Sequence, residues 1–469
     1  MNDAMMNDAI LMSFNELSKS LGALLFPGEG GERGFFSVGI DSRNLESGAL
    51  FIALPGTVHD GHSFIEAALK AGAEGIMASR SALETFNLLE LLKKWGKTLI
   101  LVEDTLKGLQ NAAGAYLEKF PGLLKIAVTG SSGKTTTKEI AAAMTGQEKK
   151  VVMNHGNLNS ETGLPLSVFN IRKFHEVGIF EAGMNRRGEI AELARVLKPD
   201  IALITNIGSA HIGILGSKEA IAEEKKAIFS QFTGNEKALI PSDEEYRDFL
   251  ARNVAGEIRF YGPESFPELG GLRDLGLEGT EITWSGKNVN FPLAGSFNLK
   301  NAFSALAIAQ EIPLSEESIR KGLESVKPLF GRGEILSGNV TVIRDCYNSN
   351  PESLKAALEF CAGLDWPGRK VYVVGSMLEL GQASEEAHLA IGPVLASSGG
   401  DMNFLFGKET GLSSDFLSAH SIPFYWADNM SELKKALGSY VKNGDLVLLK
   451  GSRGCELEQL SPLLTGGRM

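Results

Sequence analysis

The chain has few cysteines and no long apolar run, and these absences exclude several classes of protein. Three of its 469 residues are cysteine, and the spacing of Cys346, Cys361 and Cys455 matches neither a disulfide framework nor a zinc motif. No stretch approaches about 18 consecutive apolar residues, so no membrane insertion is predicted. The first residues carry Asp where a secretory signal carries Lys or Arg, and we therefore expect a cytoplasmic protein.

Positive charge is also scarce. The 46 Lys and Arg residues are outnumbered by 57 Asp and Glu residues, which gives a net charge of -11. This balance argues against nucleic acid as the main partner, because neutralising a phosphate backbone needs a basic surface. An anionic ligand must instead be held by local devices such as helix N-termini, single Lys or Arg side chains, or metal ions.

The length of the sequence and its alternation of apolar runs with helical stretches predict an α/β protein with three domains. A chain of 469 residues is too long for one core. Between about 123 and 210, apolar runs alternate with helical stretches, as in βαβ units around a parallel sheet. Three polar segments follow these runs, TGSSGKT, EAGMN and NIGSAH, and they should share one crevice because ligands bind at the carboxyl ends of parallel strands.

A second segment of alternating strands and helices lies at the end of the chain, from VTVIRDCYN (340–348) to DLVLLKGS (445–452). Between the two α/β segments, 233–297 is predicted to be antiparallel β, including EIRFYG and EITWSGKNVNFPLAG, and NLKNAFSALAIAQ is predicted to be helical. We expect a mixed α/β N-terminal domain at 1–115, a central parallel-sheet ATPase domain of the phosphate-loop type at 116–315, and a C-terminal Rossmann-like domain at 316–469.

The segment TGSSGKTT follows a strand and opens a helix, as a phosphate-binding loop does. Gly130 and Gly133 would let the backbone turn N–H groups toward an anion, Lys134 would meet phosphate, and Thr135 could ligate Mg²⁺. The pattern GxxxxGK[ST] would need Gly at Val128, so the match is incomplete. The alternative is a Gly/Ser turn with a solvated lysine.

Three further residues allow two interpretations each. Glu181 ends a strand and could ligate a hard cation, or it could pair with Arg186 or Arg187. His211 could be a ligand or an ordinary hydrogen-bonded side chain. Lys225 lies among mixed charges, which usually indicate a solvated helix face.

Eight ordered motifs resemble the Mur ligases, the ATP-dependent amide-bond ligases of peptidoglycan precursor synthesis. The N-terminal IDSRNLESGALFIALPGTVHDGHSF also resembles their UDP-sugar-binding domain. The motifs are GSSGKTT, GNLNSETGLPLS, EAGMNRRGEI, TNIGSAHIGILGSKEAIAEEK, GSFNLKNAFSALA, DCYNSNPESLKAAL, MLELG and KGSRG. Within the family, DCYNSNPES and GSMLELG resemble the members that join D-alanyl-D-alanine to UDP-N-acetylmuramoyl-tripeptide (UDP-MurNAc-tripeptide) through an acyl phosphate. Another Mur-type ligase, a folylpolyglutamate synthase and a catalytically degenerate nucleotide-binding protein are the alternatives.

The resemblance implies a cofactor site for ATP and two Mg²⁺ ions, and it implies a monomer. Lys134, His211 and Lys225 would be catalytic, with Lys225 carbamylated by CO₂ into a carboxylate-like ligand. The metal ligands would be Thr135, Glu181, His211 and Lys225. The implied nucleotide-binding residues are Gly130, Ser131, Ser132, Gly133, Lys134, Thr135, Thr136, Asn159, Asn298, Asn301, Arg332, Asp345 and Asn350. The implied substrate-binding residues are Ser42 and Arg43 near the UDP moiety and Lys450, Ser452 and Arg453 facing the incoming dipeptide.

Four positions depart from the family pattern. Phe297 replaces the His of GxHN, Ser160 replaces the second Asn of an NN pair, Ala227 stands where Glu is common, and Ser376 replaces the Asp of GDM. None of them removes an implied metal ligand or the phosphate lysine, so we expect activity to survive with altered affinity for ATP.

Overall fold

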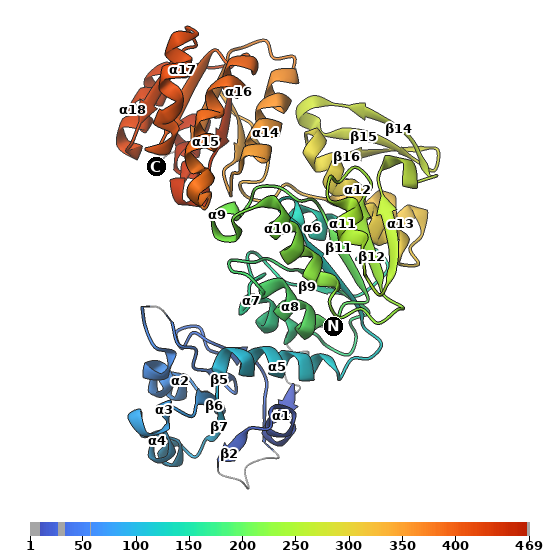
Figure 1. Cartoon of the computed structure of the whole chain (residues 1–469), viewed down its shortest axis with the longest axis vertical. Helices are drawn as coiled ribbons and strands as arrows, with labels where there is room; N and C mark the ends of the chain where they lie inside the picture. Colours follow the sequence, from blue (N-terminus) through green and yellow to red (C-terminus); the bar gives the residue numbers. More distant parts are fainter. Residues whose placement is uncertain (1–9, 27–32, 57, 467–469) are drawn as a thin grey trace.

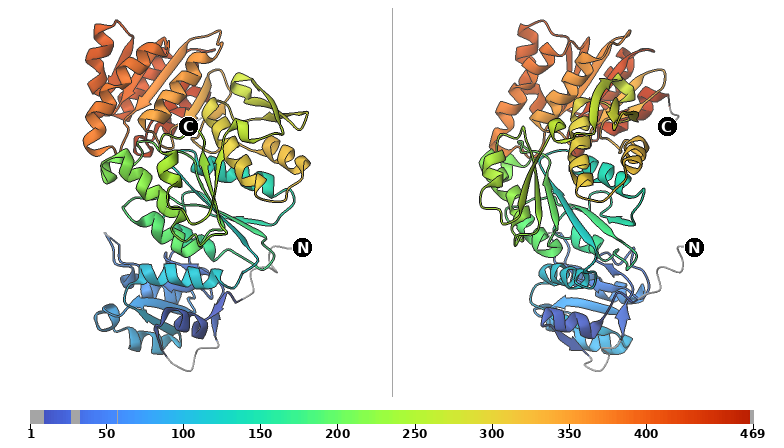
Figure 2. Two further views of the ribbon diagram at one scale, coloured as in Figure 1. Left: turned by 45° about the vertical axis from the view of Figure 1, so that its right-hand side comes forward. Right: turned by 90° about the vertical axis from the view of Figure 1, so that its right-hand side faces the viewer.

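The computed structural model describes residues 10–26, 33–56 and 58–466, so most of the N-terminal segment used to judge targeting lies outside the described residues. Three α/β domains follow one another along the long axis, with the central domain between the other two (Figures 1 and 2). The predicted fold class is confirmed. In the described part of the chain, no helix is both long and apolar enough to cross a bilayer.

The central domain is built on a six-stranded parallel sheet in the order β13-β12-β11-β8-β10-β9. Its strands are β8 (Leu124–Thr129), β9 (Val151–Met153), β10 (Val177–Glu181), β11 (Ile201–Ile204), β12 (Lys237–Pro241) and β13 (Glu257–Tyr261). Its helices are α6 (Lys134–Thr145), α7 (Gly163–Val168), α8 (Glu189–Leu197), α9 (Ile212–Leu215), α10 (Lys218–Lys226), α11 (Arg247–Ala251), α12 (Ser296–Gln310) and α13 (Glu316–Ser325). Glu181 of β10 pairs with Val128 of β8, and Ile204 of β11 pairs with Thr129. This register brings the ends of three neighbouring strands to one edge.

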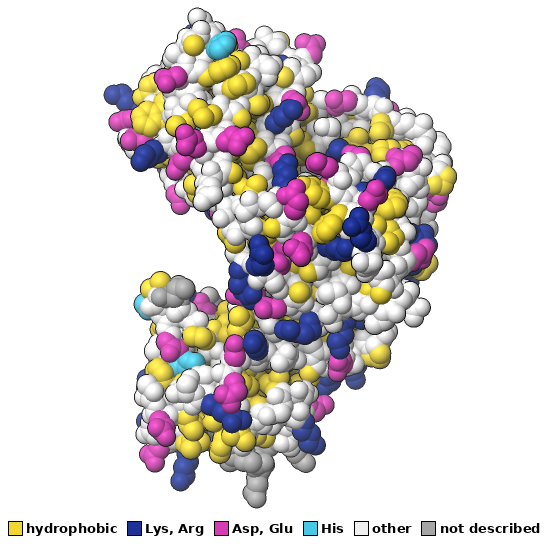
Figure 3. Space-filling model, viewed as in Figure 1, with side chains coloured by type: hydrophobic (Ala, Val, Ile, Leu, Met, Phe, Trp, Pro, Cys, Tyr) yellow, Lys and Arg dark blue, Asp and Glu magenta, His cyan; other side chains and the backbone are white. Residues whose placement is uncertain are grey.

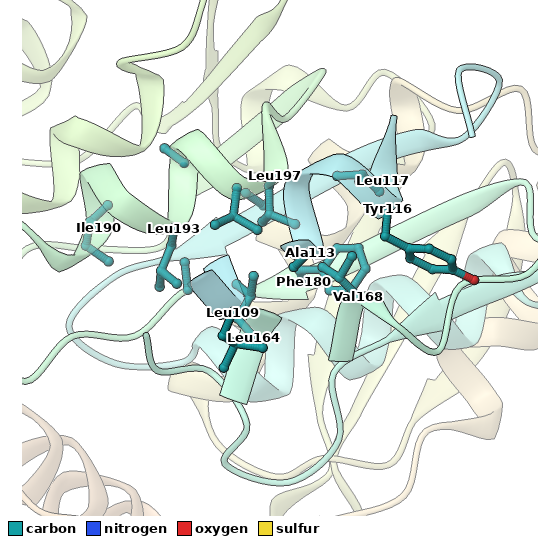
Figure 4. Packing of buried hydrophobic residues seen from close by; sticks show 14 of the residues in the cluster. Leu109, Ala113, Tyr116, Leu117, Leu164, Val168, Phe180, Ile190, Leu193 and Leu197 are labelled. Atoms are coloured by element: carbon teal, nitrogen blue, oxygen red, sulfur yellow. The ribbon is translucent and has the colours of Figure 1, made fainter. Parts of the chain in front are cut away.

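Alternating strand residues bury both faces of this sheet. Ile126 and Val128 pack in the cluster that contains α6, α12 and α13, whereas Ala127 packs in the cluster that contains α7 and α8. The second cluster continues into the N-terminal domain through α5 (Thr105–Leu117), whose residues interleave with those of α7 and α8 (Figure 4). The Tyr116 hydroxyl donates a hydrogen bond of 2.7 Å to the Ile171 carbonyl. The shared core therefore fixes the N-terminal domain to the central one.

The prediction for 233–297 was partly wrong. The segment EIRFYG forms β13, which extends the main sheet in parallel beside β12. The antiparallel part is a three-stranded sheet of β14 (Leu269–Asp274), β15 (Thr280–Trp284) and β16 (Lys287–Phe291). β13 is mostly exposed because it is the edge strand, so its composition does not carry the apolar signature of a buried parallel strand.

The C-terminal domain contains a six-stranded sheet in the order β17-β18-β22-β19-β20-β21, parallel except at β17. Its strands are β17 (Glu334–Leu336), β18 (Thr341–Asp345), β19 (Lys370–Gly375), β20 (Met402–Phe406), β21 (Phe424–Ala427) and β22 (Leu446–Lys450). Its helices are α14 (Pro351–Gly363), α15 (Ser384–Leu389), α16 (Ile391–Ser397), α17 (Ser414–Ala419), α18 (Met430–Tyr440) and α19 (Ser461–Thr465).

The N-terminal domain is smaller and holds a five-stranded sheet in the order β2-β7-β6-β5-β4. The strands of this sheet are β2 (Leu24–Phe26), β4 (Val38–Gly39), β5 (Leu50–Ile52), β6 (Gly75–Ser79) and β7 (Thr98–Val102). Two short strands, β1 (Met12–Ser13) and β3 (Gly34–Phe35), form a separate antiparallel pair. Besides α5, its helices are α1 (Phe14–Leu21), α2 (Ile65–Lys70), α3 (Ala82–Thr85) and α4 (Leu88–Trp95).

The domain boundaries stay predictions, but packing suggests where to place them. The boundary after 115 lies inside α5, and the boundary after 315 lies directly before α13. A Cβ at Gly322 of α13 would stand 2.3 Å from the Met144 Cα of α6, so α13 is packed tightly against the central domain. We propose that the second boundary follows α13.

Candidate active site

The phosphate loop consists of four residues between β8 and α6. Gly130 has φ 151° and Gly133 has φ 79°, a region that side chains rarely adopt. A Cβ on Gly130 would lie 1.8 Å from Thr205 Oγ1, and one on Gly133 would lie 2.1 Å from Asn301 Oδ1. Both positions therefore need glycine, and a loop of this length needs no glycine at Val128. Ser131, Ser132 and Thr136 lie in the same loop and the first turn of α6.

Lys134, Thr135 and Glu181 meet at the edge predicted from the parallel sheet. Lys134 Nζ donates to the Gly130 carbonyl (2.8 Å), and Thr135 Oγ1 donates to Glu181 Oε2 (2.7 Å). Asn159 Nδ2 donates to the other carboxylate oxygen, Oε1, over 2.6 Å. Burial lowers the pKa of Lys134. The side chains that bind the Glu181 carboxylate are thus the Thr135 hydroxyl and the Asn159 amide. Both groups are neutral, so they leave the negative charge of Glu181 available to a cation.

The alternative partners of Glu181 are occupied elsewhere. Arg186 pairs with Glu161 and Glu192, and Arg187 donates to the Leu215 carbonyl. The ion-pair interpretation of Glu181 was therefore wrong.

Asn154 holds the main chain of Glu181 and was missed by the sequence analysis. Asn154 Oδ1 accepts the Glu181 N–H (2.9 Å), and Nδ2 donates to the Glu181 carbonyl (2.9 Å). The buried Lys138 ammonium donates to the Asn154 carbonyl. Asn154 follows Met153, the last β9 residue that pairs with β10, so its side chain prolongs the ladder by one residue. A polar residue directly after a short strand was the available signal.

Lys225 is buried, which contradicts the solvated-face interpretation. Its relative exposure is 1%, and no hydrogen bond of its ammonium is found among the described residues. Burial, reinforced by the charge of Lys134, lowers its pKa well below the ordinary value. The neighbouring Glu224 accepts N–H groups of Gly188 (2.7 Å) and Ile190 (3.0 Å), which anchors α10 on the N-terminus of α8.

His211 faces the C-terminal domain. Its Nδ1 is 3.1 Å from Glu379 Oε2, yet the two groups are not aligned as a hydrogen bond, and Nδ1 is buried without a partner among the described residues. This contact lowers the pKa of Glu379. In the part of the chain that the structure describes, no hydrogen bond or ion pair joins His211 to Thr135, Glu181 or Lys225.

Asn301 and Arg332 also lie close to the phosphate loop. Asn301 stands beside Gly133, and Asn298 donates to the Ala294 carbonyl (2.8 Å). Arg332 stacks on the Tyr347 ring at 4.0 Å, and its positive charge contributes to the lowered pKa of Lys134. Arg332 therefore lies close enough to Lys134 to affect its charge, and its role in nucleotide binding stays a prediction.

Among the other predicted residues of the C-terminal domain, Lys450 and Asp345 contact each other, and the rest have different partners. Lys450 Nζ lies 3.1 Å from Asp345 Oδ2 and donates to the Asn348 carbonyl over 2.7 Å. Asn350 caps α14 by accepting the Ser353 N–H (2.8 Å). Separately, Ser452 Oγ accepts the Leu378 N–H (2.8 Å), and Arg453 pairs with Glu458. These residues gather at the carboxyl ends of β18, β19 and β22.

Ser42 and Arg43 belong to a loop after β4 of the N-terminal domain. Arg43 is 84% exposed and binds Asp41 at 2.7 Å, and its hydrogen bonds lower the pKa of Asp41 to about 2. Figure 3 shows a deep notch between the N-terminal and C-terminal domains, with Lys and Arg side chains along its central-domain wall.

Three of the four departures from the family pattern have local side-chain partners. The Phe297 ring packs edge-on against Phe360 of α14, with centroids 6.3 Å apart. Ser160 Oγ accepts the Gly163 N–H at the start of α7 (3.2 Å), and Ala227 ends α10. Ser376 Oγ donates to Glu409 Oε2 (2.7 Å), so a carboxylate still lies beside this position.

The donors at the phosphate loop suit a magnesium ion held jointly with a nucleotide. No cluster of three His, Cys, Asp or Glu side chains is preformed in the described ranges. Thr135 and Glu181 supply two oxygen donors, and Mg²⁺ is ordinarily bound by one or two protein oxygens together with substrate phosphates. The residues present therefore fit that ion.

The fold and this loop define a three-domain nucleotide-binding protein with a phosphate loop in its central sheet. Family comparisons match 128–309 to the Mur ligase middle domain, 331–453 to the Mur ligase glutamate ligase domain, and 36–116 to the catalytic domain of the Mur ligase family.

Individual relatives match nearly the whole chain. The UDP-N-acetylmuramoyl-tripeptide--D-alanyl-D-alanine ligase of Treponema pallidum is 42% identical over 97% of this chain and 99% of its own length. A crystal structure of MurF from Acinetobacter baumannii is 26% identical, with TM-score 0.86 over 97% of this chain and 99% of that one. The MurF ligase of Thermotoga maritima in complex with ADP is 30% identical, with TM-score 0.74 over 92% and 97%. The chain belongs to the Mur ligase family.

Proposed function

We propose that this chain joins D-alanyl-D-alanine to the terminal carboxylate of UDP-MurNAc-tripeptide at the expense of ATP, giving UDP-MurNAc-pentapeptide, ADP and phosphate in peptidoglycan precursor synthesis. The observation that supports the proposal most is the convergence of Lys134, Thr135 and Glu181 at the carboxyl edge of the central sheet. The match to the Treponema pallidum ligase along nearly its full length supports the choice of substrates.

The chemistry has two steps. A carboxylate oxygen of the tripeptide attacks the γ-phosphorus of ATP, and the bond to the ADP oxygen breaks, which gives an acyl phosphate. The amine nitrogen of D-alanyl-D-alanine then attacks the acyl carbon, loses a proton and displaces phosphate. The first step brings an anion onto a polyanion, so positive groups must offset the repulsion. Lys134 would do so at the phosphates, with Arg332 approaching from the interdomain linker.

Magnesium would supply further charge neutralisation when it is bound. We propose that Thr135 and Glu181 hold one ion and that His211 and Lys225 serve a second. Lys225 can be a ligand only as a carbamate, formed when its nitrogen attacks the carbon of CO₂ and loses a proton. Its burial with no hydrogen bond or ion pair to its ammonium among the described residues, together with its position in the family pattern, supports this modification. A cytoplasmic location and a monomeric state remain predictions from the sequence.

The N-terminal notch and the C-terminal loops would bind the two peptide substrates. Ser42 and Arg43 would approach the UDP moiety, and Lys450, Ser452 and Arg453 would face the incoming dipeptide. Because water hydrolyses acyl phosphates, we expect the C-terminal domain to cover the reacting groups.

A panel of acceptors tests the proposal. Purified protein receives ATP, Mg²⁺ and UDP-MurNAc-tripeptide containing either diaminopimelate or lysine, with D-alanyl-D-alanine or single amino acids as the amine. We expect phosphate release that requires the dipeptide and is abolished in Lys134→Ala, which keeps the wild-type circular dichroism spectrum. Release that requires a single amino acid, with the dipeptide inert, would overturn the substrate assignment.

A further inference from the structure

We propose that Glu379 of the C-terminal domain is a positioning residue for His211, accepting a hydrogen bond from Nδ1–H so that the lone pair on Nε2 is free to bind a cation. This inference deepens the proposed function, because it rests on His211 serving a metal ion. Two observations support the inference. His211 Nδ1 is buried without a hydrogen-bond partner among the described residues, and it lies 3.1 Å from the Glu379 carboxylate.

The chemistry of imidazole explains why such a partner matters. A neutral histidine carries one N–H and one lone pair, and the group that accepts the N–H decides which nitrogen binds the metal. Metal-bound histidines almost always donate their other N–H to a carboxylate, a carbonyl or water. The His211 side chain is 16% exposed and that of Glu379 is 54% exposed. Because the Glu379 carboxylate is the more exposed of the two groups, packing restricts its orientation less.

The backbones around both residues are held in close contact. The Gly213 N–H donates to the Glu379 carbonyl over 3.2 Å. A Cβ on Gly213 would lie 2.5 Å from Gly381 N and 2.7 Å from Glu379 O, so only glycine permits this approach. His211 and Glu379 both have positive φ, at 64° and 68°, which is uncommon for residues with side chains. Such strained backbone persists only where surrounding structure enforces it.

The contact between His211 and Glu379 joins the central and C-terminal domains, so it depends on how these two domains are arranged. Figure 1 shows α9 at the side of the central domain that faces the C-terminal domain. Glu352 of α14 reinforces the junction by accepting the Ser209 N–H (3.1 Å) and by pairing with Lys218 (3.1 Å). Glu379 can face Nδ1 only while the C-terminal domain rests on α9. The second cation site would thus be completed when the domains are in contact.

Cation binding tests the inference without relying on turnover. Mn²⁺ is titrated into the protein in the presence of a non-hydrolysable ATP analogue, and free Mn²⁺ is measured by electron paramagnetic resonance. Wild type and Glu379→Ala are compared. We expect Glu379→Ala to weaken the Mn²⁺ site that His211→Ala also weakens, by about 10- to 100-fold. Glu379→Gln, which keeps an acceptor and loses the charge, should have a smaller effect. Glu385→Ala, at an exposed glutamate of neighbouring α15, is the matched control and should bind Mn²⁺ like wild type.

The outcomes separate the inference from the proposed function. If His211→Ala binds both Mn²⁺ ions like wild type, His211 is not a ligand and the proposed second site fails, and the role of Glu379 fails with it. If His211→Ala weakens binding and Glu379→Ala does not, the inference alone is overturned. Gly213→Ala, which forces the backbones apart without removing a charged group, should weaken the same site, and wild-type affinity would contradict the domain coupling.

Discussion

Removing the Asn154 side chain should loosen the strand end that carries Glu181. In the structure, Asn154 is 2% exposed and pairs with Glu181 N, Glu181 O and Leu158 O at 2.9, 2.9 and 2.8 Å. The variant Asn154→Ala leaves these three main-chain groups without their partner. We therefore expect a local effect on stability and an indirect effect on catalysis.

The size of both effects follows from the buried contacts. A buried polar group left unsatisfied costs about 1–3 kcal/mol, and water can replace part of the lost bonding, so we expect about 2–4 kcal/mol for the three groups. This corresponds to roughly a 30- to 1,000-fold loss of hydrogen-exchange protection at the Glu181 amide. Loss of a residue that orients a metal ligand typically lowers activity by about 10- to 100-fold, so we expect kcat of Asn154→Ala to decrease by about that factor.

Hydrogen exchange monitored by mass spectrometry over 177–184 measures the first effect, and phosphate release measures the second. Asn170→Ala is the matched control because Asn170 is an exposed asparagine of the same domain. Asn154→Asp places a buried carboxylate oxygen against the Leu158 and Glu181 carbonyl oxygens, so it should be at least as damaging as Asn154→Ala. Protection and kcat equal to those of Asn170→Ala would refute the assigned role of Asn154.

Three further predictions concern Lys225, Phe297 and His388. Lys225→Ala should be nearly inactive and partly rescued by added small carboxylates, and full activity without them would contradict the carbamate. Phe297→Ala removes an aromatic contact with Phe360 of the C-terminal domain that is worth about 0.5–1.5 kcal/mol. We expect this contact between domains to support nucleotide binding, so calorimetry should show up to about tenfold weaker binding of an ATP analogue. Unchanged affinity would show that the contact does not contribute to nucleotide binding. Burial lowers the pKa of His388, whose neutral Nε2 accepts the Met377 N–H (3.0 Å). The unfolded chain therefore binds the proton at higher pH, so this stability is complete above pH about 6.5 and is lost as pH falls below it. The thermal midpoint of wild type should drop between pH 7 and 5.5 more than that of His388→Asn, and equal slopes would refute the assignment.

Much of the fold and part of the site could be predicted because their signals are local. The sequence from Ile126 to Ile140 contains the strand, the glycine turn and the helix in order, and the parallel-sheet rule then brought Glu181 to the same edge. The resemblance to the Mur ligases directed attention to Lys225, whose charged neighbours had indicated a solvated helix face. Its burial depends on α10 packing on α8 through Glu224, a contact between segments far apart in the sequence.

The features that escaped prediction depend on pairing or on contacts between domains. EIRFYG alternates like an antiparallel strand because it lies at the edge of the sheet, where exposure hides the parallel arrangement. Asn154 gains its role from the register between β9 and β10, which the sequence does not state. The approach of Glu379 to His211 depends on how two domains meet, and no periodicity within either segment encodes that contact.

The central claim is that the phosphate bound at Lys134 is transferred to a peptide carboxylate, and oxygen labelling tests it most directly. UDP-MurNAc-tripeptide with ¹⁸O at both oxygens of its terminal carboxylate is incubated with ATP, Mg²⁺, D-alanyl-D-alanine and the protein, and the released phosphate is analysed by mass spectrometry. An acyl phosphate predicts that one oxygen of the attacked carboxylate leaves with phosphate, so each phosphate should carry one ¹⁸O. Phosphate free of ¹⁸O, with the peptide product still formed, would contradict the account.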